Sequence, residues 1–98
     1  MKAKLYKDYL LKHLQDPERA AGYLTECYKL GEAEFLIALR DVVEAHGGIG
    51  QISKAARLNR ENLYRLLSHG GNPTLASLNT ILAVLGLKLE FAPDKKAP

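Results

Sequence analysis

The 98-residue sequence predicts an all-α fold, a compact helical bundle that ends in one short β-strand. Apolar residues recur three and four positions apart along most of the chain, as they do on one face of a helix. Only residues 87–91 alternate strictly between apolar and charged, which is the period of a strand with one buried face, so we expect a strand over residues 87–92. A chain of this length buries a single hydrophobic core, so we expect one domain.

The first half of the chain predicts three helices. A short one is expected over residues 7–14. Asp16 then precedes a helix over residues 17–30, because an aspartate accepts hydrogen bonds from free amides and a proline suits the first helical position. Gly31 can adopt the left-handed conformation that ends this helix. A third helix is expected over residues 32–46, followed by two glycines that stop it.

Two short helices are expected next, over residues 50–57 and 59–68. Asn59 is a good cap for the second one, and the interruption before it leaves a tight turn between them. This pattern predicts a helix-turn-helix, which the N-terminal helices precede. The positions expected to face inward are Ile52, Ala55 and Ala56 in the first helix, and Leu63, Leu66 and Leu67 in the second.

The last elements are a helix capped by Thr74 and ended by Gly86, and then the strand. The helix should bury one face made of Leu75, Leu78, Ile81, Leu82 and Leu85. A single strand must pair with something, either its own copy across a two-fold axis or residues near the N-terminus. We therefore expect residues 1–46 to complete the bundle, residues 47–92 to hold the helix-turn-helix and the strand, and residues 93–98 to form a frayed tail.

The net charge of +3 is concentrated in one segment. Residues 49–70 hold four basic residues and one acidic residue, so this segment accounts for the whole formal excess. It coincides with the predicted helix-turn-helix, and a basic patch on such a unit is where a polyanion would bind.

The outer face of the second short helix has the chemistry needed to read DNA. Arginine can make a two-pronged contact with guanine, asparagine can do so with adenine, and glutamate can accept from cytosine. The residues expected to read bases are Arg60, Glu61, Asn62 and Arg65. Other polar residues nearby are expected to contact phosphates, which set register and affinity without reading sequence. These are Gln51, Lys54, Arg57, Asn59, Tyr64, Ser68, His69 and Asn72.

Several other classes of protein are disfavoured. No apolar run approaches the length of a membrane span, and the polar start of the chain lacks the apolar core of a signal peptide, so we expect a cytoplasmic protein. The lone Cys27 is expected to be a small buried residue, and no metal site or cofactor is predicted. His13, His46 and His69 are widely separated and no catalytic spacing recurs, so we do not expect an enzyme. His46 more simply complements or caps a helix C-terminus.

The run GGIGQISKAARLNRENLYRLLSHGGNPTLASLNTILAVLGLKLEF resembles a known family. It is similar to the lambda-repressor-like (XRE/Cro-type) helix-turn-helix of the addiction-module antidote proteins, the antitoxin partners of RelE- and ParE-like toxins. The segment FLIALRDVV and the pair Tyr23-Leu24 are similar to the family's preceding helices, so the resemblance covers nearly the whole chain. Two residues depart from the pattern. Arg57 replaces the usual glycine of the turn and must adopt a strained backbone or remodel it. Ser53 replaces a small apolar residue, and its hydroxyl can bond to a carbonyl one turn earlier.

The resemblance implies a dual role for the protein. It would bind and neutralise a small RelE/ParE-like toxin, an mRNA-cleaving enzyme, and would repress the operon that encodes both. The N-terminal helices and the C-terminal strand are both candidate surfaces for the toxin. A homodimer on double-stranded operator DNA is expected, because one recognition helix covers only a few base pairs. Two alternatives stay open: a stand-alone repressor without a toxin, and a protein-interaction module that does not bind DNA.

Overall fold

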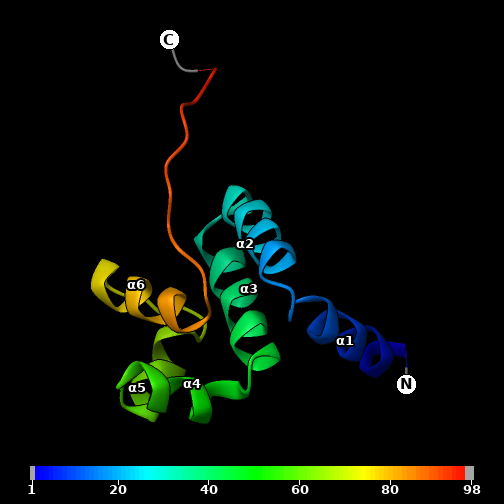
Figure 1. The fold of residues 1–98 in the computed structure, drawn as a ribbon, viewed down its shortest axis with the longest axis vertical. Coiled ribbons are helices and arrows are strands. Elements are labelled where there is room, and N and C mark those ends of the chain that lie inside the picture. Colours follow the sequence, from blue (N-terminus) through cyan, green and yellow to red (C-terminus); the bar gives the residue numbers. More distant parts are fainter. Residues whose placement is uncertain (1, 97–98) are drawn as a thin grey trace.

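The computed structural model describes residues 2–96 and places six helices in this range, with no strand (Figure 1). The helices are α1 (Lys2–His13), α2 (Pro17–Leu30), α3 (Glu32–Ala45), α4 (Gly48–Ala56), α5 (Arg60–Leu66) and α6 (Leu75–Val84). The all-α class is therefore confirmed, whereas the C-terminal strand is not found. No helix within residues 2–96 is both long and apolar enough to cross a membrane.

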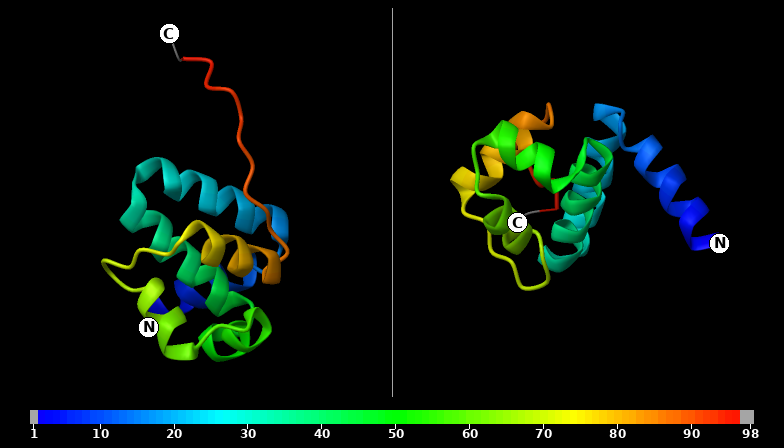
Figure 2. Two further views of the ribbon diagram at one scale, coloured as in Figure 1. Left: turned by 90° about the vertical axis from the view of Figure 1, so that its left-hand side faces the viewer. Right: turned by 90° about the horizontal axis from the view of Figure 1, so that it is seen from below.

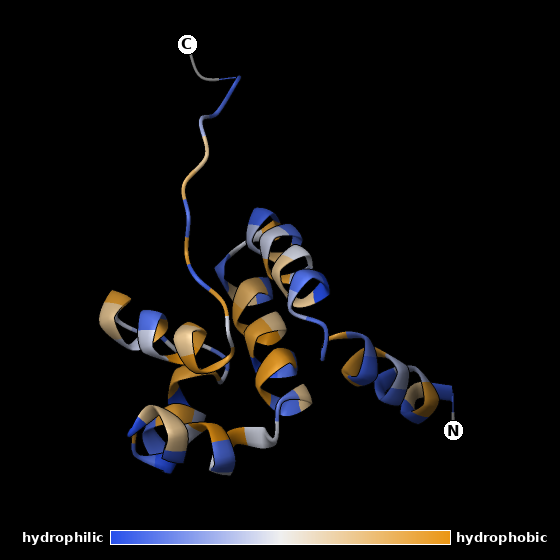
Figure 3. Cartoon of the chain, in the orientation of Figure 1, coloured by the Kyte–Doolittle hydropathy of each residue, from blue (hydrophilic) through white to orange (hydrophobic). Residues whose placement is uncertain are grey.

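The long helix α3 lies at the centre of the bundle. It packs against α2 on one side, and its C-terminal half contacts α1 and α4. Helix α4 in turn packs against α5 and α6, so these three short helices form the other half of the molecule (Figure 2). The fully buried side chains of Leu39, Leu63 and Ile81 come from α3, α5 and α6, and join the two halves in one core. Apolar residues are accordingly prominent on both α3 and α6 (Figure 3).

Three helix starts follow the capping chemistry that the sequence predicts. An oxygen of the Asp16 side chain accepts a hydrogen bond from the Glu18 amide at 3.0 Å, at the start of α2. Asn59 accepts from the Asn62 amide at 3.1 Å, and Thr74 accepts from the amide of residue 77 at 3.0 Å. Each bond satisfies an amide that has no partner within its own helix.

Two details of the first three helices differ from expectation. Helix α1 begins at Lys2 rather than near residue 7. None of its residues is buried, and the buried Leu14 comes directly after its end. Gly31 does separate α2 from α3, but its φ of 145° and ψ of 169° are not the left-handed helical conformation we predicted. The next helix begins at once, so the chain reverses at a glycine whose positive φ other residues rarely adopt.

The predicted strand over residues 87–92 is wrong, because this segment pairs with no other part of the described chain. Helix α6 is closed by Gly86, which follows its last turn and is left-handed, with φ 77°. The Gly86 amide donates to the Ala83 carbonyl, and the Leu87 amide donates to the Leu82 carbonyl at 2.8 Å. The chain then leaves the body as an extended tail (Figure 1). Phe91, expected on a buried face, is 94% exposed. The residues of this tail alternate as those of a strand do, but no neighbouring strand is present in the described chain for them to bond with.

Two positions expected to face inward face solvent instead. Ala55 is exposed, and Ser53 takes the buried place, because the core-facing row of α4 is Ile52, Ser53 and Ala56. Leu75 is 64% exposed, since it is the first residue of α6 and extends beyond the neighbouring helices. The other predicted inward positions of α4, α5 and α6 are buried or half-buried.

Candidate nucleic-acid interface

Helices α4 and α5 are joined by a three-residue turn that contains a strained arginine. Arg57 has φ 57° and ψ 38°, and it is the one non-glycine residue within residues 2–96 with positive φ. Its amide bonds to the Lys54 carbonyl at 3.2 Å, and the Leu58 amide bonds to the Ser53 carbonyl at 2.9 Å. This is the closing geometry that glycine normally adopts, and a side chain there costs about 1 kcal/mol. The strained backbone expected from the sequence is confirmed.

Ser53 is the buried polar residue of this two-helix unit, and its hydroxyl is satisfied locally. Its Oγ donates a hydrogen bond to the Gly50 carbonyl at 3.0 Å, as the sequence predicts. A buried hydroxyl without such a partner would be destabilising. The departure from an apolar residue at this position is therefore compatible with a packed core.

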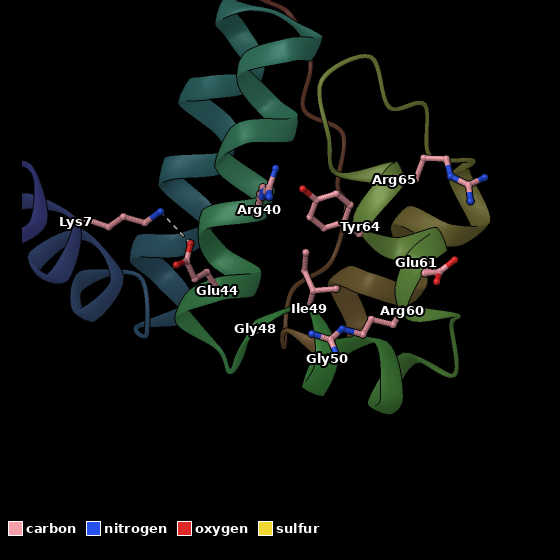
Figure 4. A pocket seen from close by; sticks show the side chains of 10 residues that line it. All are labelled: Lys7, Arg40, Glu44, Gly48, Ile49, Gly50, Arg60, Glu61, Tyr64 and Arg65. Atoms are coloured by element: carbon pink, nitrogen blue, oxygen red, sulfur yellow. Dashed lines mark ion pairs between the residues drawn. The ribbon is translucent and has the colours of Figure 1, made fainter.

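Helix α5 is attached to the core by its leucines and exposes its opposite side. Leu63 and Leu67 are buried beneath it. The four residues predicted to read bases are all exposed: Arg60, Glu61, Asn62 and Arg65. Figure 4 shows Glu61 and Arg65 extending away from α3, while Arg60 reaches back along α5 toward Gly50 of α4. The face predicted to read bases is thus accessible rather than packed against the rest of the chain.

An open groove of about 950 Å³ runs between α5 and α3 (Figure 4). Lys7 of α1 and Arg40 and Glu44 of α3 line one wall. The first turn of α4 and four residues of α5 line the other wall: Arg60, Glu61, Tyr64 and Arg65. We name this cavity the α3–α5 groove. It brings three of the four predicted base-reading residues together with basic residues from outside the two-helix unit.

Two contacts organise the α3–α5 groove. The guanidinium carbon of Arg40 lies 5.0 Å from the centroid of the Tyr64 ring, a cation–π contact that joins α3 to α5. The Lys7 ammonium lies 3.1 Å from a carboxylate oxygen of Glu44, which links α1 to α3. Tyr64 was predicted to contact phosphate directly, whereas its ring here supports an arginine.

The residues predicted to contact phosphate do not gather in one place. Those that are exposed lie on α4 (Gln51 and Lys54), on the turn before α5 (Arg57 and Asn59), on α5 itself (Tyr64) and on the loop after it (His69 and Asn72). Ser68 is half-buried, and its hydroxyl donates to the Arg65 carbonyl at 2.7 Å. Ser68 and His69 line a second cavity of about 180 Å³ against α3, which Arg40 also lines.

Arg40 and Lys7 are the groove residues that sequence reasoning missed. The charge count was confined to residues 49–70, so basic residues on earlier helices were not considered. Arg40 lies at the edge of the buried stripe of α3, one turn after Leu36, and it is half-buried, so the pattern of this helix did not mark it as a groove residue.

Three side chains elsewhere in the bundle have structural roles. The Tyr23 hydroxyl donates to Asp41 at 2.7 Å, and burial together with this bond raises the pKa of Tyr23 far above its ordinary value. Burial raises the pKa of Cys27, which is half-buried rather than fully buried as predicted. His46 is the C-cap of α3, as predicted: its backbone amide donates to the Val42 carbonyl at 3.1 Å. Its Nε2 also lies 3.1 Å from the Leu14 carbonyl, which joins the end of α3 to the chain after α1.

The fold and this surface define a small helical-bundle protein with an exposed, basic two-helix unit. Residues 5–93 match a family model described as "Probable addiction module antidote protein", and the chain belongs to that family. A protein of Haemophilus influenzae, described as uncharacterized, is 34% identical over 93 residues, which cover 93% of this chain and 95% of the relative. No solved structure matches the chain. Membership of an antidote family implies a toxin partner in general, and thus an antitoxin role.

Proposed function

We propose that this antitoxin binds double-stranded operator DNA through α4 and α5, represses its own operon and neutralises a RelE/ParE-like toxin. In this proposal α4 and α5 act as a lambda-repressor-like helix-turn-helix, and the protein acts by binding rather than by catalysis. It binds its operator as a homodimer.

The accessible outer face of α5 carries the proposal. Arg60, Glu61 and Arg65 are exposed on a helix whose other side is fixed by buried leucines, so they can enter a major groove without any rearrangement of the core. The turn before α5 is closed by backbone hydrogen bonds, and the Asn59 side chain caps α5 by accepting from the Asn62 amide. A recognition helix needs this rigidity because a base contact depends on the position of the whole helix.

A mobility-shift titration with the DNA upstream of the gene tests the DNA half. We expect the wild-type protein to bind this DNA more tightly than a scrambled duplex of equal length. Arg65→Ala should lose about tenfold or more in affinity for the operator, as one good base contact is worth about 1–3 kcal/mol. Its melting temperature should not change, because Arg65 is exposed. Equal affinity of the wild type for both duplexes would refute sequence-specific binding, and no binding to either duplex would favour a protein-interaction module.

The toxin half is tested separately by co-expression. We expect the product of the adjacent reading frame to co-purify with this protein and to arrest growth when expressed alone. Antidote-family membership supports this expectation, and the resemblance to antitoxins of RelE/ParE-like toxins supplies the toxin class. An adjacent product that neither binds nor arrests growth would favour the stand-alone repressor.

A further inference from the structure

We propose that the α3–α5 groove is a binding site for a phosphate of the DNA backbone, with Arg40 as the ligand and Tyr64 as the residue that positions it. The inference rests on the proposed DNA-binding function. It extends the interface beyond the two-helix unit to α3, which has not been assigned a role in binding DNA.

The first observation is that Arg40 lacks an acidic partner within residues 2–96. None of the ion pairs in this range includes it. Glu44, one turn further along α3, is instead paired with Lys7 at 3.1 Å. Lys7 therefore neutralises the carboxylate that would otherwise compete for Arg40 and repel a phosphate at this wall of the groove.

The second observation is the stacking of Arg40 on Tyr64. A guanidinium over an aromatic ring loses conformational freedom but keeps its N–H groups at the edge free to donate. Two parallel N–H groups match the oxygens of a phosphate in a two-pronged contact. With its guanidinium carbon 5.0 Å from the ring centroid, Arg40 is held in place before any ligand arrives.

The third observation is the position of the groove beside the base-reading face. Arg60, Glu61 and Arg65 line the groove and also belong to that face. The major groove is about 12 Å wide and a helix with its side chains is about 10–12 Å across, so a backbone strand must pass close to each side of an inserted helix. On the α3 side of α5, that strand would meet Arg40.

The charge of the groove also suits an anion. Its lining residues include Lys7, Arg40, Arg60 and Arg65 against Glu44 and Glu61, a net charge of +2. Because the Lys7–Glu44 pair cancels itself, the remaining +2 comes from Arg40 of α3 and from Arg60 and Arg65 of α5, against Glu61. A groove of this kind favours an anionic backbone over an acidic patch on a folded protein, because the base-reading residues lie on the same wall.

The test is a salt titration of operator binding by the full-length protein. We expect Arg40→Gln to weaken binding to operator and scrambled DNA by the same factor, about tenfold at physiological salt, and to reduce the slope of log K against log[salt] by about 1. Arg19→Gln is the matched control. It removes the same charge from α2, outside the groove, and should leave the slope unchanged.

Variants of Tyr64 test its positioning role. Tyr64→Phe keeps the ring and should behave as wild type, whereas Tyr64→Leu should weaken DNA binding nearly as much as Arg40→Gln. The double variant Arg40→Gln/Tyr64→Leu should be no weaker than Arg40→Gln alone, since the two residues act as one unit. Additive losses would show that Tyr64 does not act through Arg40.

The outcomes separate this inference from the proposed function. If Arg65→Ala loses operator binding but Arg40→Gln keeps the wild-type slope, the groove is not a phosphate site and the DNA-binding function stands. If Arg40→Gln leaves DNA binding intact but weakens capture of the toxin, the groove is a protein-binding surface and the inference is wrong. If the wild type binds no DNA, both fail.

Discussion

The strained turn at Arg57 is a residue-scale feature with opposite consequences for stability and binding. Arg57→Gly should raise the free energy of unfolding by about 0.5–1 kcal/mol. Glycine removes the cost of about 1–2 kcal/mol for holding a side chain in the left-handed conformation, and it adds a smaller cost because it loses more conformational entropy on folding. For a domain of this size the melting temperature should rise by about 4 °C, which thermal unfolding measures.

The matched variant for this prediction is Arg57→Ala. It removes the same charge but keeps a side chain at φ 57°, so it should not gain stability. If Arg57 contacts phosphate as predicted, both variants should weaken DNA binding alike. A stabilised alanine variant would mean that the arginine charge, and not its backbone, is the source of strain.

The hydrogen bond between Tyr23 and Asp41 ties α2 to α3 at 2.7 Å. Tyr23→Phe should lower the free energy of unfolding by about 1.5 kcal/mol near neutral pH, because it leaves a carboxylate without its donor. Urea unfolding measures this loss, and a change of only a few tenths of a kcal/mol would show that water replaces the hydroxyl fully.

The pH dependence of this difference has a defined sign. The pKa of Tyr23 is raised in the folded state, so above about pH 10 the unfolded chain loses its phenolic proton first and becomes relatively more stable. Wild-type stability should therefore fall toward that of Tyr23→Phe as the pH rises beyond 10. A difference that stays constant with pH would contradict the assignment.

Residue-level sequence reasoning succeeded where the chemistry is local. Asp16, Asn59 and Thr74 cap helices because each side chain reaches an amide two or three residues away. The bond from Ser53 to its preceding turn is local in the same sense. By contrast, the stacking of Arg40 on Tyr64 joins residues 24 positions apart and depends on how α3 and α5 pack, so no local pattern could predict it.

At the scale of elements, α4 and α5 are expected to contribute different kinds of DNA contact. Lys54 is exposed on α4, away from the α3–α5 groove, and we predict that it binds phosphate. Lys54→Ala should lower affinity for all DNA sequences by the same factor and reduce the salt slope by about 1. Arg65→Ala should instead lower the preference for operator over scrambled DNA.

Salt titrations of both variants on both duplexes distinguish these effects. An unchanged slope for Lys54→Ala would remove α4 from the phosphate interface. Loss of sequence preference in Lys54→Ala, rather than in Arg65→Ala, would mean that α4 and not α5 enters the major groove.

The type of an element was predictable for a helix, whose apolar stripe marks the face that packs on the core. It was not predictable for a strand, which needs a second strand to bond with. The 3.6-residue period of α3 identifies its core face because Leu36, Leu39 and Val43 meet the rest of the bundle. The two-residue period of residues 87–92 has no such consequence, since a strand is stable only beside another strand. Phe91 is exposed for this reason, although its neighbours alternate as a strand would.

At the scale of the whole molecule, the size of α5 limits how a single chain can recognise an operator. The helix has seven residues, and three of its four predicted base-reading residues also line the α3–α5 groove. One such helix contacts only a few base pairs, and each base pair contributes about 1–3 kcal/mol of discrimination. Under the proposed function, specific repression would therefore require a second copy on the same operator.

We predict that two chains bind one operator, on half-sites about 34–36 Å apart, which is one turn of DNA. Light scattering of the saturated complex should give two chains per duplex. A duplex with half the site should bind a single chain with much lower affinity, because the second set of contacts is lost. Inserting five base pairs between the half-sites should abolish the gain in affinity that the second chain provides. The insertion rotates one half-site by about half a turn, to the opposite face of the duplex. One chain per operator at saturation, with unchanged affinity on the half-site, would show that a single α5 suffices and that the repressor acts as a monomer.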